Sequence, residues 1–114
     1  MRLALLLVFL PPAAATTLAC NCAETGSPVE IASSTLDREP ELRLTGDARL
    51  ECMRRDKANR CDVYWIVPAK AGTVTIALDF PDGVRVEDVI EYGTDDAYPC
   101  RGNIRPVHDH ITRF

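Results

Sequence analysis

The clearest pattern in the chain is the strict alternation of apolar with polar or small residues over 73–80, TVTIALDF. Its apolar members share one face: Val74, Ile76, Leu78 and Phe80. Because successive side chains of a strand point to opposite faces, this pattern predicts a half-buried strand. The turn residues 81–83, PDG, follow, and 84–86, VRV, resumes the alternation. We therefore expect a β-hairpin over these residues.

A second strong pattern covers 60–68, RCDVYWIVP, and it is apolar on both faces. One face carries Cys61, Val63, Trp65 and Val67, and the other carries Tyr64 and Ile66. Two apolar faces predict a strand that is covered on both sides or that leaves an apolar patch around Tyr64 and Ile66 at the surface. We expect Trp65 in the core, because valines flank it on its own face, and Tyr64 at the surface.

Shorter alternations complete a series of strands without marked helical periodicity. The expected strands lie near 29–33, 41–45, 48–54, 60–67, 73–80 and 84–91, with a seventh near 103–112. The acidic pair 87–88 interrupts the sixth, which predicts a bulge or a strand end. Turn signals recur every 8–12 residues or so, which favours an all-β fold: a small antiparallel β-sandwich or barrel.

The first 19 residues have the layout of a secretory signal. A single positive charge at Arg2 is followed by an apolar run over 3–10, a proline pair and small residues up to Ala19. The apolar run is shorter than the ~20 residues that a membrane-spanning helix needs, and the prolines would break it. We expect cleavage of residues 1–19, with ordinary signal-peptidase cleavage after Ala15 or Ala19 as one model.

A second cleavage model places a lipid on Cys20. Residues 16–20, TTLAC, resemble the bacterial lipoprotein signal class: small or apolar residues, then Ala, then Cys, without nearby upstream charge. Thr17 stands where that class usually has Leu. The resemblance implies a diacylglycerol thioether and further acyl chains such as palmitate on Cys20, and hence a membrane anchor. Asn21 after the cysteine is typical of sorting to the outer membrane, on the periplasmic side.

The number of cysteines supports the lipid model. The chain has five, and an odd number in an exported protein leaves one thiol to explain. A lipid on Cys20 leaves four, which suffices for two disulfides in an oxidising compartment. Adjacent strands favour a bridge between Cys52 and Cys61, both on expected inward faces, which leaves Cys22 to pair with Cys100. The alternatives stay open: four cysteines allow three pairings, and Cys20 could replace Cys22.

Removal of the signal leaves residues 20–114, a single small domain with a thin core. We expect 20–28 to be a lipidated tether and 29–114 to be the β-domain. The full chain has a net charge of −4, and loss of Arg2 makes it about −5 by subtraction. Such an acidic chain is a poor candidate for binding nucleic acid.

Four cations gather in one expected turn of this acidic chain: Arg54, Arg55, Lys57 and Arg60. Such a cluster can orient a module against an acidic partner or anionic lipid headgroups, or it can be an ordinary solvated turn. Tyr64 lies near it in the sequence and could add an aromatic anchor. We take these five residues as the candidate partner-binding site.

The sequence carries no clear catalytic signature, and we expect neither enzymatic activity nor a cofactor. His108 and His110 would point the same way on a strand, as a metal half-site needs, but their spacing matches no zinc motif. The acidic residues between 87 and 96 lack the ordered spacing of a calcium loop and are expected to form a solvated surface.

The expected function is therefore non-catalytic binding by an envelope lipoprotein, with a membrane partner through the lipid and an unknown envelope protein as the other partner. An inhibitor, an immunity-type protein or a subunit of an envelope assembly fits the size, acidity and cysteines. The alternatives are a soluble secreted disulfide-rich protein, and a metal-binding protein or enzyme that uses His108 and His110.

Overall fold

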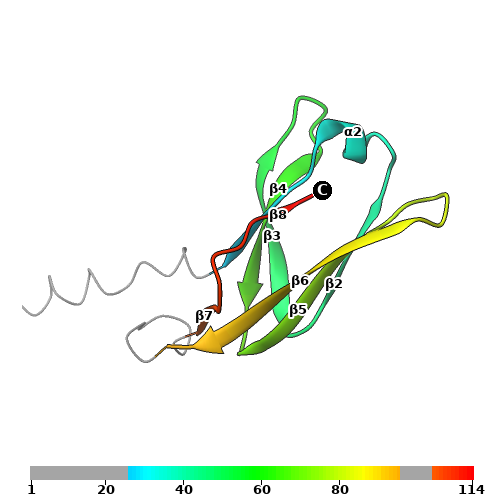
Figure 1. The fold of residues 1–114 in the computed structure, drawn as a ribbon. Helices are drawn as coiled ribbons and strands as arrows, with labels where there is room; N and C mark the ends of the chain where they lie inside the picture. The colour runs from blue at the N-terminus through cyan, green and yellow to red at the C-terminus, as the bar shows by residue number, and fades with distance from the viewer. Residues whose placement is uncertain (1–25, 96–103) are drawn as a thin grey trace, which may run out of the picture.

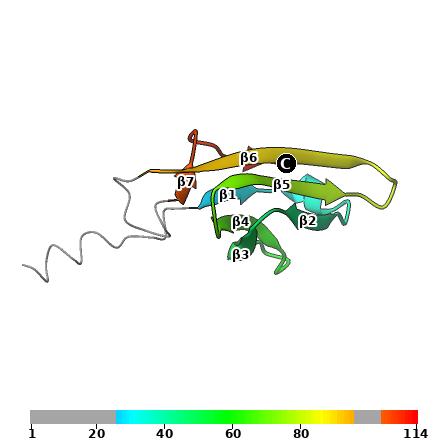
Figure 2. The ribbon, with the colours of Figure 1, turned by 90° about the horizontal axis from the view of Figure 1, so that it is seen from below.

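The computed structural model describes residues 26–95 and 104–114. They form two four-stranded, mostly antiparallel sheets and one short helix (Figure 1). The expected all-β class is confirmed. Figure 2 shows the sheets as two layers, and they share one hydrophobic core.

The first sheet has the strand order β2-β5-β6-β7. Its strands are β2 (Glu41–Thr45), β5 (Gly72–Asp79), β6 (Arg85–Thr94) and β7 (Ile104–Pro106). The predicted hairpin is its centre: β5 and β6 pair without a register shift from Gly72 opposite Tyr92 to Asp79 opposite Arg85. The turn between them closes as expected, with Gly83 at a φ of 89° and its N–H donated to the carbonyl of Phe80.

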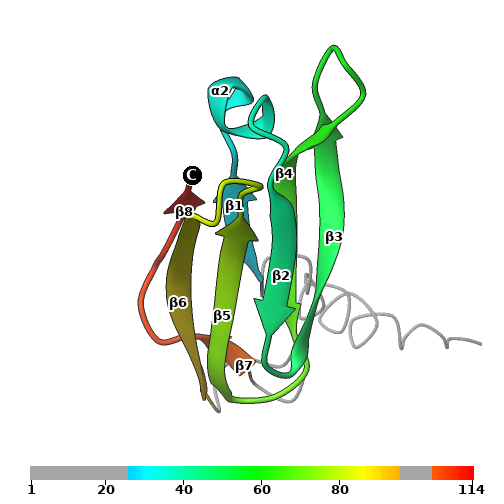
Figure 3. The same ribbon diagram turned by 90° about the vertical axis from the view of Figure 1, so that its right-hand side faces the viewer.

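The second sheet has the order β3-β4-β1-β8. Its strands are β1 (Ser27–Glu30), β3 (Ala48–Arg55), β4 (Cys61–Pro68) and β8 (Thr112–Arg113). The short helix α2 (Ser33–Leu36) connects β1 to β2 across the two layers. β8 pairs parallel to β1, and the other strand pairs are antiparallel. Figure 3 shows β2, β5 and β6 of the first sheet in front, with β4 behind β2 and β3 to the right of β2.

The core lies between the facing sides of the two sheets. Fully buried aliphatic side chains come from both: Val29 and Ile66 from the second sheet, Val74, Ile76 and Leu78 from the first. The predicted apolar face of β5 is therefore the inner face of its sheet. Tyr92 is also buried there, and its hydroxyl donates to Ser27 Oγ at 2.7 Å, which joins the two sheets. Burial raises the pKa of the Tyr92 phenol.

The expected faces of β4 are wrong. Tyr64 and Ile66 face inward: Ile66 is completely buried, and Tyr64 packs against the core. Trp65, expected in the core, lies on the opposite face of the strand and is partly exposed. The predicted apolar surface patch at Tyr64 and Ile66 is therefore not present. Both faces of β4 are apolar in sequence, and alternation alone does not say which one meets the other sheet.

The expected interruption at residues 87–88 is also wrong, because β6 continues through both residues. Asp88 pairs with Ile76 and points toward the space between the sheets rather than to a solvated acidic surface. Its carboxylate is half-buried and accepts hydrogen bonds from the Thr112 hydroxyl at 2.7 Å and from His110 Nε2. The single strand expected near 103–112 is two short strands, β7 and β8, which belong to different sheets.

Candidate functional site

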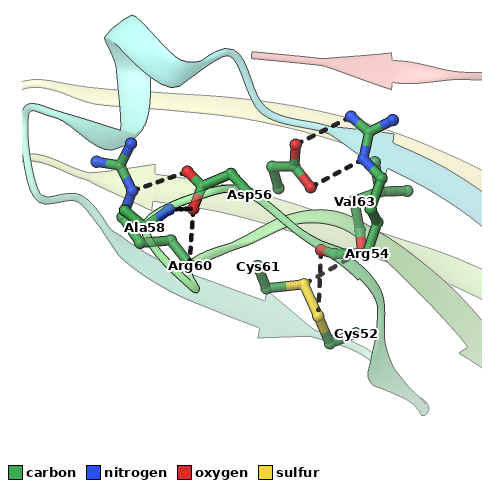
Figure 4. Close-up of polar contacts among 8 residues, drawn as sticks. Cys52, Arg54, Asp56, Ala58, Arg60, Cys61 and Val63 are labelled. Atoms are coloured by element: carbon green, nitrogen blue, oxygen red, sulfur yellow. Dashed lines mark hydrogen bonds and ion pairs between the residues drawn. A yellow bond between two sulfur atoms is a disulfide. The ribbon is translucent and has the colours of Figure 1, made fainter.

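The β3–β4 hairpin contains the predicted basic cluster and is closed by a disulfide between Cys52 and Cys61 (Figure 4). The two cysteines are not directly paired, since Cys52 lies opposite Tyr64 and Cys61 opposite Arg55. β3 shifts its register against β4 between Cys52 and Arg55, and the Cα atoms of Cys52 and Cys61 are 5.9 Å apart. The predicted bridge is confirmed. The expectation that both cysteines lie on inward faces is wrong, because Cys61, although buried, shares its face of β4 with Trp65, and Cys52 is exposed.

The turn beyond the disulfide is organised by Asp56. One oxygen of its carboxylate accepts the backbone N–H groups of Ala58 and Arg60, each at 2.9 Å. The other oxygen accepts Arg60 Nε at 2.9 Å. Asn59 adopts a φ of 65°, a left-handed conformation that asparagine tolerates better than most residues. The backbone bond from Arg60, together with its guanidinium, lowers the pKa of the Asp56 carboxyl.

Arg54 and Asp62 form a bidentate ion pair close to the turn of the hairpin (Figure 4). Arg54 Nε and Nη2 donate to the two carboxylate oxygens at 3.1 and 2.9 Å. The Asp62 side chain is only 12% exposed, so its carboxylate needs this partner. The hydrogen bonds from Arg54 lower the pKa of the Asp62 carboxyl.

Arg60 ties the hairpin to the rest of the domain. Besides Asp56, its guanidinium donates to Asp37, the residue that caps the end of α2, at 2.8 Å. The turn is therefore held both by its own residues and by the connection between the sheets.

Two of the four predicted cations, Arg54 and Arg60, are therefore neutralised by ion pairs. The other two, Arg55 and Lys57, lie at the turn end of the hairpin, which we call the β3–β4 tip. Arg55 Nη1 donates to the carbonyl of Asn59 at 3.0 Å, which orients the guanidinium without cancelling its charge. Lys57 is exposed and has no ion-pair partner among the described residues. Both line a surface hollow of about 440 Å³ that also includes Ser33. Of the predicted site, Tyr64 lies apart from this tip, since its ring packs on the core.

The predicted histidine pair is not brought together as a ligand set. His110 contacts Asp88, whereas His108 is exposed. Within 26–95 and 104–114, no group of three His, Cys, Asp or Glu side chains could hold a metal ion.

The residues on which the export and lipid predictions depend lie outside the described ranges: the leader, Cys20, Cys22 and Cys100. In the part that the structure describes, no helix has the length and hydropathy to cross a membrane.

Sequence reasoning missed the acidic residues that organise this hairpin. Asp56 follows Arg54 by two residues, and Asp62 follows Arg60 by two residues. This spacing of opposite charges was the signal available in the sequence. Asp37 carries no comparable signal, because only the fold brings it to Arg60.

Comparison with known proteins adds no relative: no family model, no curated protein and no solved structure matches this chain.

Proposed function

We propose that this chain is a membrane-anchored envelope lipoprotein that binds a protein partner without catalysis. In this proposal a lipid on Cys20 holds the domain to the membrane, with Asn21 directing it to the outer membrane. The residues between the anchor and Ser27, where β1 begins, connect it to the β-domain. The features that support the anchor are the leader, the TTLAC sequence and the odd number of cysteines.

The observation that carries the binding proposal is the construction of the β3–β4 tip. The disulfide and the Arg54–Asp62 and Arg60–Asp56 pairs hold the hairpin in one conformation. Rigid presentation lowers the entropy cost of association. Arg55 and Lys57 then offer positive charge beside a hollow, which favours an acidic segment of a partner protein. An inhibitor, an immunity-type protein or an assembly subunit would use such a tip.

The anchor is tested by intact-mass spectrometry of the protein from membrane fractions, with Cys20→Ser and Cys22→Ser as a matched pair. We expect an acyl mass on the unaltered chain and on Cys22→Ser, and loss of membrane association for Cys20→Ser. A processed product that starts elsewhere, or that carries an unmodified Cys20, contradicts the anchor and supports the secreted alternative.

The binding surface is tested by a photo-crosslinking amino acid at Ala58 in cells, with the same group at Asp82 on the β5–β6 turn as the positional control. We expect one specific protein adduct from position 58 and none from position 82. Lys57→Glu should abolish the adduct, because it reverses the charge at the tip. Lys70→Glu, an exposed lysine elsewhere, should leave the adduct unchanged. Equal effects of the two substitutions would contradict a role for the tip.

A further inference from the structure

The outer edge of β6 is open over the first part of the strand. β7 pairs with Tyr92–Thr94, and within the described residues Arg85–Ile90 have no strand partner on that side. The carbonyl of Glu91 accepts from Val107 N–H at 2.9 Å on this side, and the carbonyl of Val84 accepts from Phe80 on the other. Because backbone groups alternate in direction along a strand, the N–H and C=O groups of Arg85 and Glu87 point outward from this edge.

Exposed apolar side chains gather along the same edge. The described residues include six large hydrophobic side chains that are well exposed, and four of them lie on or beside β6. These four are Val84, Val86, Val89 and Val107, whose N–H donates to the carbonyl of Glu91. Single exposed apolar residues are ordinary, but an unpaired strand bordered by several of them can accept another strand.

The charged side chains on this edge are arranged so that the edges of two copies of the chain complement each other. Arg85 and Glu87 flank Val86, and both charged side chains are 49% exposed. When two such strands pair antiparallel about a two-fold axis centred on Val86, Arg85 of each copy lies opposite Glu87 of the other. The pairing thus creates two cross-strand opposite-charge contacts and places Val86 against its own symmetry mate.

We propose that the β6 edge is a homodimer interface in which a second copy of this chain pairs antiparallel through Arg85–Glu87. The inference rests on a different surface from the β3–β4 tip and does not depend on the proposed function. The dimer would join the two β2-β5-β6-β7 sheets edge to edge, with the valines of both copies along the seam.

The structure also limits the length of the paired segment. The N–H of Val89 donates to the carboxylate of Asp88 at 2.9 Å, and the N–H of Gly83 donates to Phe80. In the proposed register Gly83 lies opposite Val89, so this pair offers no free N–H group. The backbone hydrogen bonds of the interface are then those that Arg85 of each copy exchanges with Glu87 of the other copy. So short a pair of strands makes a weak, reversible dimer.

Cysteine cross-linking tests the register directly. Val86→Cys places a thiol opposite its symmetry mate in a non-hydrogen-bonded pair, where Cα atoms about 4.5 Å apart permit a disulfide. Val89→Cys is the matched control, because residue 89 is more exposed but faces residue 83 of the other copy. On non-reducing gels of protein from cells expressing the full chain, we expect roughly tenfold more disulfide-linked dimer from Val86→Cys than from Val89→Cys. Equal cross-linking, or none at position 86, overturns the proposal.

Charge reversal tests the complementarity. Glu87→Arg places Arg opposite Arg twice, and we expect the dimer dissociation constant, measured by sedimentation velocity, to rise roughly tenfold. Glu51→Arg is the control, because Glu51 and Arg49 form the same spaced pair on the edge strand β3. An equal loss with Glu51→Arg, or no loss with Glu87→Arg, overturns the proposal.

Mixing two charge-reversed variants tests whether association is restored. Arg85→Glu protein carries two acidic residues at this edge and Glu87→Arg protein carries two basic ones, so the mixed dimer restores both opposite-charge contacts. We expect the mixture to associate at least as tightly as the unaltered chain, and failure to do so by two folded variants contradicts the register. Arg85 also contacts Asp79 within the chain, so circular dichroism checks the fold of Arg85→Glu first. If that variant is unfolded, the Glu87→Arg and Glu51→Arg comparison decides.

Discussion

The two long hairpins of the domain, β3–β4 and β5–β6, are held in register by different means. β5 and β6 pair over eight consecutive residues, and the inner face of β5 is completely buried. β3 shifts register twice within its last residues, where its side chains from Glu51 to Arg55 are exposed. The disulfide and the bidentate Arg54–Asp62 pair are found in this second hairpin.

The difference shows how the register of a strand is fixed where the strand has no buried face. Burial of one face specifies register by itself, because a slip by one residue would turn the apolar side chains into solvent. The distal part of β3 has no such face, and the Cys52–Cys61 disulfide takes over that role. Paired charges occur in both hairpins, as Arg54–Asp62 in β3–β4 and as Arg85–Asp79 in β5–β6. Each hairpin should therefore be most sensitive to substitutions at its own source of stability.

The largest effect is expected in the β5–β6 hairpin from Leu78→Ala. Leu78 is fully buried, so the substitution removes apolar contacts and leaves a cavity. We expect the free energy of unfolding to fall by about 2–5 kcal/mol, as measured by urea denaturation. Thr73→Ala, an exposed position on the same strand, should change it little. Similar losses for the two variants would argue against burial as the source of stability.

The next effect is expected in the β3–β4 hairpin from the double substitution Cys52→Ala/Cys61→Ala. Loss of a bridge with a sequence separation of 9 is worth about 2–3 kcal/mol in the chain-entropy account. Hydrogen exchange should quicken in the distal part of this hairpin and stay unchanged in the middle of β5 and β6. Uniform acceleration across both hairpins would mean that the bridge supports the whole domain rather than one register.

A smaller effect is expected from the turns. Asp56→Ala removes the acceptor of two backbone N–H groups and of a guanidinium, whereas Asp82→Ala removes the acceptor of the Val84 N–H at 3.1 Å and an exposed pairing with Arg38. We expect Asp56→Ala to lower the melting temperature more than Asp82→Ala. A reversed order would show that the β5–β6 turn relies more on its aspartate.

The smallest effect is expected from pH. The pKa of Asp62 is lowered in the fold by hydrogen bonds from Arg54, so the unfolded state binds protons more readily. The stability that the ionised Asp62 carboxylate contributes is present above the unfolded pKa of about 4, and it is lost as the pH falls through the lower folded pKa. We expect Asp62→Asn to flatten the decline in stability between about pH 5 and 2, relative to the unaltered chain. An unchanged slope would show that Asp62 titrates alike in both states.

The strands that follow a single buried face could be predicted from sequence, and β5 with its turn is the best case. The alternation at 73–80 and the PDG turn act locally, so they require no knowledge of distant residues. The Cys52–Cys61 bridge was also predictable, because adjacent strands bring the two cysteines together.

What could not be predicted depends on contacts between distant segments. Asp88 remains inside β6 because His110 and Thr112 supply its hydrogen bonds, and nothing near Asp88 in the sequence indicates them. Both faces of β4 are apolar, so the choice of Tyr64 rather than Trp65 for the core was made by the opposite sheet. In the candidate site, the cluster of cations was visible in sequence, but its division into paired and unpaired charges required the bulged register.

The parallel pairing of β8 with β1 has a consequence for the order in which the domain can be completed. β1 has β4 on one side, and its other side is filled by Thr112–Phe114, with Phe114 N–H donating to Glu30 and Ala32 N–H donating back to Phe114. A chain that emerges from a ribosome or a translocation channel N-terminus first therefore keeps one side of β1 unsatisfied until Thr112–Phe114 have emerged. The β5–β6 hairpin can form early, whereas closure of the other sheet has to wait.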